Sequence, residues 1–122
     1  GRLLEVEPDE VAAHRVEHVR EAAERSGAVV LLKGDDTIVA LPGGPLAISP
    51  GGTPALATAG TGDVLSGLIG ALLAKGLGAF EAAALGVLAH VLSAEHAADR
   101  LGADHVMAGD VIESLPHGLT LR

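Results

Sequence analysis

The chain has 122 residues, of which 48% are hydrophobic, a composition that argues against intrinsic disorder and predicts one domain folded around one core. Its formal charge of -8 opposes the phosphate-backbone contacts of nucleic-acid-binding proteins, so we expect no nucleic acid as a partner. Because the chain contains no cysteine, disulfides, thiolate metal sites and cysteine nucleophiles are excluded, and the chain is compatible with a reducing cytoplasm, where we expect it to work.

The first predicted element is a helix that runs from Asp9 to about Ser26 and is ended by Gly27. Its apolar face consists of Ala12, Val16, Val19 and Ala23. Arg15 belongs to the opposite face, which the charged side chains occupy. A continuous apolar run at residues 28–32 then predicts a strand that is buried on both faces.

Two more short strands are predicted at residues 37–41 and 46–48, separated by a turn of glycine and proline. We expect these two strands to be antiparallel and to lie at a sheet edge. A loop rich in glycine, proline and threonine follows at residues 49–62.

Helical periodicity predicts three further helices, at residues 63–75, 79–100 and 110–115. The short link after Gly76 makes the first two of them antiparallel neighbours. The residues expected to be buried on the second helix are Leu85, Leu88 and Leu92. The glycines expected to let the helices approach closely are Gly67, Gly70 and Gly86.

The start of the chain and its apolar stretches indicate whether it is part of a longer protein and whether it crosses a membrane. The chain begins at Gly1 with neither a methionine nor an apolar leader, so we expect it to be part of a longer protein. The longest charge-free apolar stretches, residues 64–74 and 82–94, are shorter than the roughly 18 to 20 residues that cross a bilayer. We therefore expect core helices and no membrane partner.

The segment with the strongest chemical signal is the run of small residues and glycines at 53–62, which leads into the helix expected at Asp63. The N–H groups at a helix N-terminus attract anions, and glycines let a phosphate approach them closely. Two interpretations of Asp63 are open on spacing alone. It is either an acid that complements the helix dipole, or a base that takes a proton from a substrate hydroxyl while the amides stabilise the transferred group.

Two stretches of the sequence stand out together: ATAGTGDVLSG at residues 57–67 and VLLKGDDT at residues 30–37. With the Gly86 to His90 pattern and the closing AGDVIESLP at residues 108–116, they resemble the C-terminal part of the ADP/ATP-dependent NAD(P)H-hydrate dehydratases, members of the ribokinase-like superfamily. The resemblance extends over essentially the whole chain. It implies an α/β fold of ribokinase-like helix-sheet-helix layers, with residues 1–122 as the C-terminal part of a single domain.

The resemblance also implies an activity: repair of hydrated NADH or NADPH to NAD(P)H with ADP or ATP and Mg²⁺, by phosphorylation of the hydrate hydroxyl and elimination. Asp63 would be the catalytic residue, at the hydrated nicotinamide. The residues implied at the nucleotide are Lys33, Gly34, Asp35, Asp36, Thr37, Thr53, Pro54, Ala55, Leu56, Ala57, Thr58, Ala59, Gly60, Thr61 and Gly62. No residue is implied as a metal ligand, since magnesium would arrive with the nucleotide, held mainly by phosphates and water.

The chain departs from the family pattern in two ways. The family often has Asn-Pro-Gly-Met where this chain has Thr53-Pro54-Ala55-Leu56, which removes an amide side chain and a glycine from the nucleotide contacts. The family domain is also longer, so we expect residues 1–122 alone to be inactive, to need the N-terminal half and to self-associate. Two alternatives stay open: a ribokinase-like kinase for a vitamin-precursor alcohol, and a non-catalytic nucleotide-binding fragment.

The histidines give weaker signals. His14 and His18 are spaced for one helix face, but charged neighbours and the lack of an evident third ligand favour a solvated face over a zinc site. His90 lies within a buried helix and is expected to be a hydrogen-bonded core or interface residue rather than a catalytic base.

Overall fold

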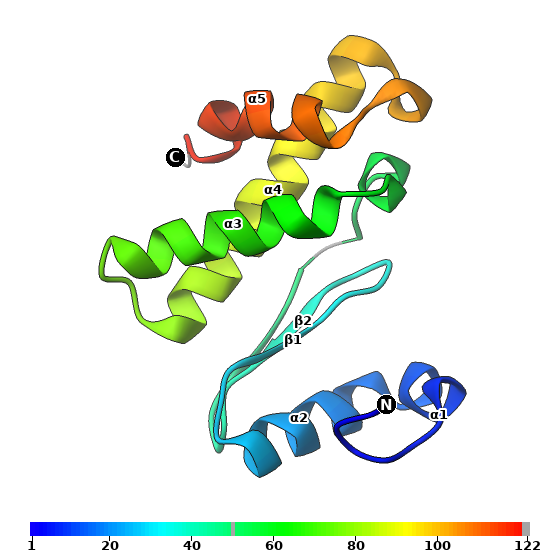
Figure 1. The fold of residues 1–122 in the computed structure, drawn as a ribbon, viewed down its shortest axis with the longest axis vertical. Helices are drawn as coiled ribbons and strands as arrows, with labels where there is room; N and C mark the ends of the chain where they lie inside the picture. Colours follow the sequence, from blue (N-terminus) through cyan, green and yellow to red (C-terminus); the bar gives the residue numbers. More distant parts are fainter. Residues whose placement is uncertain (50, 121–122) are drawn as a thin grey trace. The chain divides into compact units, whose positions relative to one another are not determined.

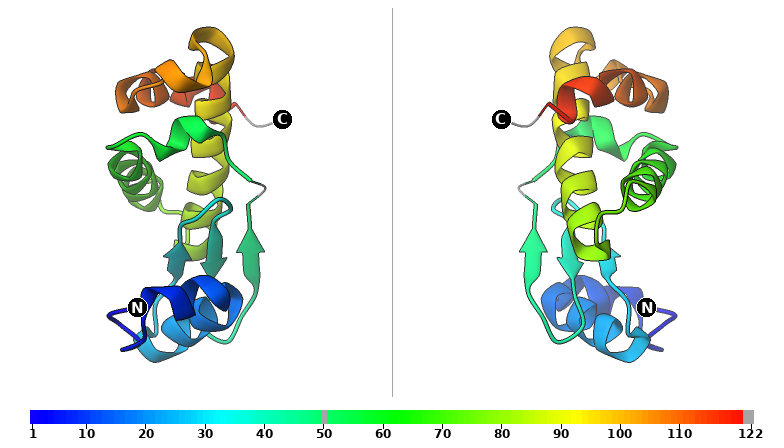
Figure 2. Two further views of the ribbon diagram at one scale, coloured as in Figure 1. Left: turned by 90° about the vertical axis from the view of Figure 1, so that its right-hand side faces the viewer. Right: turned by 90° about the vertical axis from the view of Figure 1, so that its left-hand side faces the viewer.

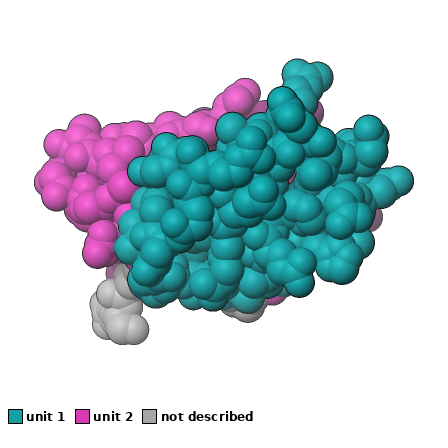
Figure 3. Space-filling model, turned by 90° about the horizontal axis from the view of Figure 1, so that it is seen from below, with its two compact units in different colours: residues 1–50 teal, residues 51–122 magenta. Residues whose placement is uncertain are grey.

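The computed structural model describes residues 1–49 and 51–120. The chain forms two compact units, residues 1–50 and residues 51–122, which Figure 3 shows in different colours. Each unit has apolar clusters of its own, whereas the composition predicts a single core. None of the helices among the described residues is both long and apolar enough to cross a membrane.

The first unit begins with two helices, α1 (Pro8–Ala13) and α2 (Arg15–Ser26), where the sequence predicts one. The break lies at His14, whose φ of -134° and ψ of 56° are outside the helical region. Gly27 ends α2 as predicted, with the left-handed φ of 65° that glycine adopts without strain. The buried face of α2 includes Val19 and Ala23, but Val16 of the predicted apolar face is 40% exposed.

The three strands of the first unit are β1 (Val30–Leu32), β2 (Ile38–Ala40) and β3 (Leu46–Ile48), and they form an antiparallel sheet in that order (Figure 1). The predicted antiparallel pairing of the second and third strands is confirmed. β2 is the central strand and all three of its residues are buried. Ile38 and Ala40 cluster with Val19 and Ala23 of α2, whereas Val39 lies on the opposite face of the strand. The prediction that the first strand is buried on both faces is wrong: β1 is half-buried and pairs, within the described ranges, with β2 alone.

The second unit is helical, with a 3₁₀ turn η1 (Pro54–Ala57), helices α3 (Thr61–Ala74) and α4 (Ala79–Leu101), a 3₁₀ turn η2 (Ala103–His105) and helix α5 (Ala108–Gly118). α3 and α5 both lie beside α4, and the two views of Figure 2 agree on this. α3 begins two residues earlier than predicted. α5 is longer than predicted and contains Pro116, beyond which the Leu119 N–H still donates to the Leu115 carbonyl at 2.8 Å.

Helix α4 buries small side chains rather than the predicted leucines. Leu85 and Leu92 are half-buried and Leu88 is 38% exposed, so their predicted burial is wrong. The residues of α4 that are buried are Ala82, Ala83, Gly86, Val87, Ala89, His90, Val91, Ser93, Ala94 and Ala97. Because alanine, glycine and serine line this face, the backbones of the neighbouring helices approach closely.

Two glycines mark the closest approaches. A Cβ atom on Gly86 would lie 2.6 Å from Ile69 Cγ1 of α3, which confirms the predicted role of that glycine. A Cβ atom on Gly118 of α5 would collide with Ser93 Oγ and the Ala89 carbonyl of α4. Gly67 and Gly70, for which we predicted the same role, have no neighbour within 4 Å of an added Cβ, so that prediction is wrong.

Substitution of Gly86 therefore tests the α3–α4 contact. We expect Gly86→Ala to lower the free energy of unfolding by about 1–3 kcal/mol, because the new methyl group overpacks against Ile69. Gly70→Ala is the matched control: it meets no neighbour and gains helix propensity of about 1 kcal/mol. Denaturant unfolding of both variants measures the difference, and equal stabilities would contradict the close approach at Gly86.

Candidate functional site

The loop before α3 is attached to the interior of the second unit by its own apolar residues. Ala55 of η1 is wholly buried and clusters with Ala94, Val106 and Val111, with Leu56 packed against them. Thr53 begins this turn: its Oγ1 accepts from the Ala55 N–H at 3.3 Å. The loop that leads into α3 is thus held in place by buried apolar contacts and a hydrogen bond at its start.

Thr61, the first residue of α3, connects three parts of the second unit. Its hydroxyl is 2.8 Å from the Leu56 carbonyl and 2.9 Å from the Thr58 carbonyl, and the residue is 2% exposed. Its own carbonyl lies 2.9 Å from Nε2 of His90 on α4. Since a carbonyl only accepts, Nε2 carries the proton in this contact. His90 is 3% exposed, which confirms the expectation of a buried, hydrogen-bonded residue.

The other side of the loop is fixed by the segment between η2 and α5. Thr58 Oγ1 donates to the Val106 carbonyl at 3.1 Å. Gly60 has a φ of 90°, and a Cβ atom there would lie 3.2 Å from the Ala108 Cβ. Position 60 therefore requires glycine both for its backbone conformation and for its contact with Ala108.

These contacts take up carbonyl groups and leave amide groups available. No described residue accepts a hydrogen bond from the main-chain N–H of Ala59, Gly60 or Gly62. These amides lie at the N-terminus of α3, where the helix dipole favours an anion. Asp63 is the third residue of α3 and is exposed, so its carboxylate stands beside the same helix start. The start of α3 therefore has main-chain N–H donors next to a carboxylate.

The second predicted segment, Lys33 to Thr37, forms the turn between β1 and β2 in the first unit. Lys33, Gly34 and Asp35 are exposed, and the main-chain N–H groups of residues 33–36 have no acceptor among the described residues. The turn ends at Thr37, whose N–H donates to Ser49 Oγ at 3.0 Å and whose carbonyl accepts from the Ser49 N–H at 2.9 Å. This turn also presents amides that an anion could use.

The structure groups the predicted residues in two sets, one in each unit. Residues 53–63 come together at the start of α3, and residues 33–37 form the β1–β2 turn. Within the first set, Ala55 and Thr61 are buried, Gly60 is exposed and Gly62 is half-buried. Within the described ranges no group of three or more histidine, aspartate or glutamate residues could hold a metal ion.

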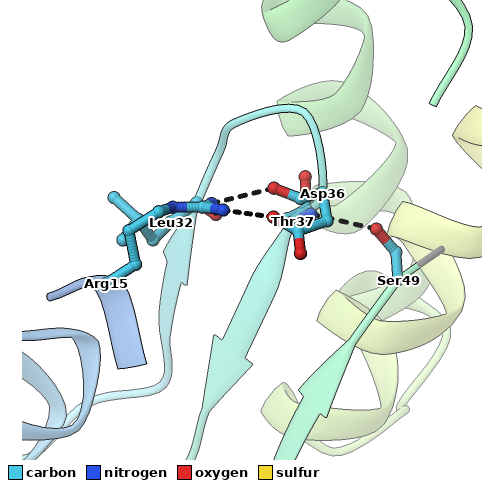
Figure 4. A network of polar contacts seen from close by, with 5 residues as sticks. All are labelled: Arg15, Leu32, Asp36, Thr37 and Ser49. Atoms are coloured by element: carbon cyan, nitrogen blue, oxygen red, sulfur yellow. Dashed lines mark hydrogen bonds and ion pairs between the residues drawn. The ribbon is translucent and has the colours of Figure 1, made fainter. Parts of the chain in front are cut away.

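Sequence reasoning missed two residues that contact the β1–β2 turn from outside it, Arg15 on α2 and Ser49 after β3. Arg15 was expected on the solvated face of a helix, but its guanidinium binds Asp36 and two carbonyls of the turn (Figure 4). Helical spacing places Arg15 among charged neighbours, and the break at His14 that redirects it has no signal in the periodicity. Nothing in the pattern around Ser49 marks it as a partner of Thr37.

Two kinds of comparison with known proteins, a family model and solved structures, match this chain. The model of the NAD(P)H-hydrate dehydratase family matches residues 2–117 of this chain. The structure of Bacillus subtilis YxkO is 33% identical, with a TM-score of 0.86 over 93% of this chain and 42% of that one. The ADP/ATP-dependent NAD(P)H-hydrate dehydratase of Bacillus subtilis, co-crystallised with ATP and Mg²⁺, is 33% identical, with a TM-score of 0.84 over 90% of this chain and 40% of that one.

These matches confirm the α/β fold class predicted from the sequence. They also fix the extent of the similarity, since this chain spans less than half the length of the solved structures that it matches. No curated protein matches the chain.

The role of Thr61 in shaping the loop can be tested by Thr61→Val, which keeps the shape of the side chain and removes the hydroxyl. We expect a loss of about 1–3 kcal/mol in the free energy of unfolding, because the carbonyls of Leu56 and Thr58 lose a buried donor. Thr120→Val is the control, since that hydroxyl donates to the Pro116 carbonyl at an exposed position. If both variants unfold at the same denaturant concentration, Thr61 does not hold the loop.

Proposed function

Because the chain belongs to the NAD(P)H-hydrate dehydratase family, we propose that it is the C-terminal, nucleotide-binding part of an enzyme that uses ADP or ATP to dehydrate hydrated NADH and NADPH. The similar Bacillus subtilis protein is an ADP/ATP-dependent NAD(P)H-hydrate dehydratase that was co-crystallised with ATP and Mg²⁺, which supports the same nucleotides here. We propose a cytoplasmic location, which family membership favours. Residues beyond 1–122 would complete the substrate pocket, given the share of the similar chains that is covered.

The observation that carries this proposal is the set of amides from Ala59, Gly60 and Gly62 beside the Asp63 carboxylate. A nucleotide phosphate would accept hydrogen bonds from these amides at the start of α3. We also propose that the nucleotide contacts the turn at residues 33–36, whose main-chain N–H groups have no acceptor among the described residues. Magnesium would enter bound to the phosphates, because Mg²⁺ keeps several waters and takes few protein ligands in such sites.

In the proposed reaction, the Asp63 carboxylate accepts the proton of the hydrate hydroxyl, and the hydroxyl oxygen attacks the terminal phosphorus of the nucleotide. The bond from that phosphorus to the leaving nucleotide breaks, so that ATP becomes ADP, or ADP becomes AMP. The amides at the start of α3 stabilise the charge on the transferred group. The carbon–oxygen bond of the ester then breaks with loss of phosphate, and the neighbouring carbon releases a proton to restore the ring double bond.

A direct assay separates this reaction from its closest alternative. The full-length protein is incubated with hydrated NADH, ATP and Mg²⁺, and recovery of the near-ultraviolet absorbance of the dihydronicotinamide ring is followed. Recovery of NADH with release of inorganic phosphate supports the proposal. A stable phosphate ester of an alcohol, without NADH recovery, would instead identify a small-molecule kinase, and ATP binding without turnover of any substrate would identify a binding fragment.

We also propose that the protein self-associates. Unit 2 exposes several large apolar side chains, among them Leu73 at 44%, Leu88 at 38% and Ile112 at 53%. Exposed apolar area of this kind favours association. Light scattering of the full-length protein would give its oligomeric state.

The role of Asp63 predicts a separation of turnover from binding. We expect Asp63→Asn to lower kcat by about a hundredfold or more, because the amide cannot accept the substrate proton. ATP affinity should stay close to that of the wild type, since main-chain N–H groups hold the phosphates. Single-turnover kinetics and calorimetric titration in the full-length protein measure the two quantities, and near-normal turnover would exclude Asp63 as the base.

Substitution of Gly62 is expected to lower nucleotide affinity, in contrast to Asp63→Asn, which lowers turnover. We expect Gly62→Val to weaken ATP and ADP binding while the protein stays folded, because a branched side chain in the first turn of α3 obstructs the approach of a phosphate. The backbone at position 62 is helical and has no positive φ, so conformational strain does not contribute. Calorimetric titration with both nucleotides decides the matter: an unchanged affinity would mean that the phosphates bind elsewhere.

A further inference from the structure

Arg15, at the start of α2, holds the turn at residues 33–37 in addition to the contact of Thr37 with Ser49. Its Nη1 donates to the Asp36 carboxylate, and its Nη2 donates to the Asp36 carbonyl at 2.8 Å and to the Leu32 carbonyl at 3.2 Å (Figure 4). Leu32 is the last residue of β1, and Asp36 lies within the turn. One planar group therefore connects the end of β1 to the turn.

The geometry depends on the shape of the guanidinium as well as on its charge. Arginine offers several N–H donors in a fixed plane, whereas the ammonium of lysine is a compact point charge. The Arg15 side chain is 24% exposed and that of Asp36 is 40% exposed, so the pair is partly shielded from water. Two of the three acceptors are main-chain carbonyls, which makes the contact a restraint on the backbone.

Gly34 shows that the turn is built around this side chain. A Cβ atom on Gly34 would lie 2.6 Å from Arg15 Nη2 and 2.8 Å from its Cζ. Gly34 has no positive φ, so its backbone does not require glycine. The space that a side chain would fill at position 34 is occupied by the guanidinium of Arg15.

The ion pair between Arg15 and Asp36 also compensates negative charge in the turn. Asp35 and Asp36 put two carboxylates next to amides that we assign to a phosphate, and carboxylates repel phosphates. Arg15 pairs with the Asp36 carboxylate. One of the two opposing charges is thereby compensated, and the main-chain N–H groups of residues 33–36 have no acceptor among the described residues.

We propose that Arg15 is a positioning residue for the nucleotide: it fixes the Lys33–Thr37 turn in the conformation that presents its amides to the phosphates, and it neutralises Asp36 beside them. This inference rests on the proposed function, because it takes the turn as part of the nucleotide site. Arg15 itself need not touch the nucleotide.

The same helix supplies a matched control. Glu24 of α2 accepts a hydrogen bond from the Gly43 N–H, in the turn between β2 and β3. That turn lies at the other end of β2 from the Lys33–Thr37 turn. Glu24→Gln therefore weakens a single, exposed contact between α2 and a turn that we do not assign to the nucleotide.

The experiment compares Arg15→Ala, Arg15→Lys and Glu24→Gln in the full-length protein by ATP titration, steady-state kinetics and thermal unfolding. We expect Arg15→Ala to weaken ATP binding and raise its KM about tenfold, as loss of charge-assisted hydrogen bonds implies, while kcat at saturating ATP changes less. Arg15→Lys should restore binding only in part. Glu24→Gln should lower the unfolding temperature without changing the KM for ATP.

Three results would overturn the inference. They are wild-type ATP affinity in Arg15→Ala, an equal loss of affinity in Glu24→Gln, and full rescue by Arg15→Lys, which would reduce the role to charge alone. If the wild-type protein does not bind ATP, the proposed function is overturned as well. Titration of the wild type with ATP therefore distinguishes failure of the proposed function from failure of the inference on Arg15.

Gly34→Ala gives a second test, in which Arg15 itself stays in place. Gly34→Ala should weaken ATP binding by displacing the guanidinium, and the effect should disappear in the Arg15→Ala background, where nothing occupies that space. Additive losses in the double variant would show that Gly34 acts independently of Arg15 and would overturn the proposed contact.

Discussion

Side-chain donors that occupy main-chain carbonyls determine the shape of both candidate segments. In the first unit, Arg15 takes the carbonyls of Leu32 and Asp36. In the second, the Thr61 hydroxyl reaches the carbonyls of Leu56 and Thr58. A turn whose carbonyls are bound inward can present its N–H groups outward, and amides of this kind are what a phosphate requires. Each unit, despite its different secondary structure, therefore presents main-chain N–H groups because side-chain donors occupy the nearby carbonyls.

Much of this organisation can be predicted from the sequence because it is local. Glycine at position 27 ends a helix, the turn of residues 42–45 separates two strands, and the periodicity of α3 and α4 gives their extents within a few residues. The glycine-rich approach to α3 likewise identifies the N-terminus that carries the candidate site. Each of these features depends on neighbours within one or two turns of the chain.

The features that escaped prediction depend on contacts between distant residues. Periodicity gives Arg15 to the solvated face, but the break at His14 and the position of Asp36 direct it into the β1–β2 turn. Leucine spacing on α4 predicts a leucine-lined interface, yet the close approach of α3 and α5 selects the small residues between those leucines, among them Gly86 and Ala89. Hydrophobicity ranks side chains by their affinity for the interior and contains no information on how near two backbones lie.

The contact between Gly118 and α4 has a consequence for how α5 is placed along its neighbour. Its Cα faces Ser93 Oγ and the Ala89 carbonyl, where a side chain would collide. A slide of α5 by one residue would bring His117 or Leu119 to this point, and neither fits against a helix backbone. Small residues elsewhere on α4 would tolerate such a slide, because one alanine resembles the next. A single glycine, Gly118, therefore sets the axial register of α5 against α4.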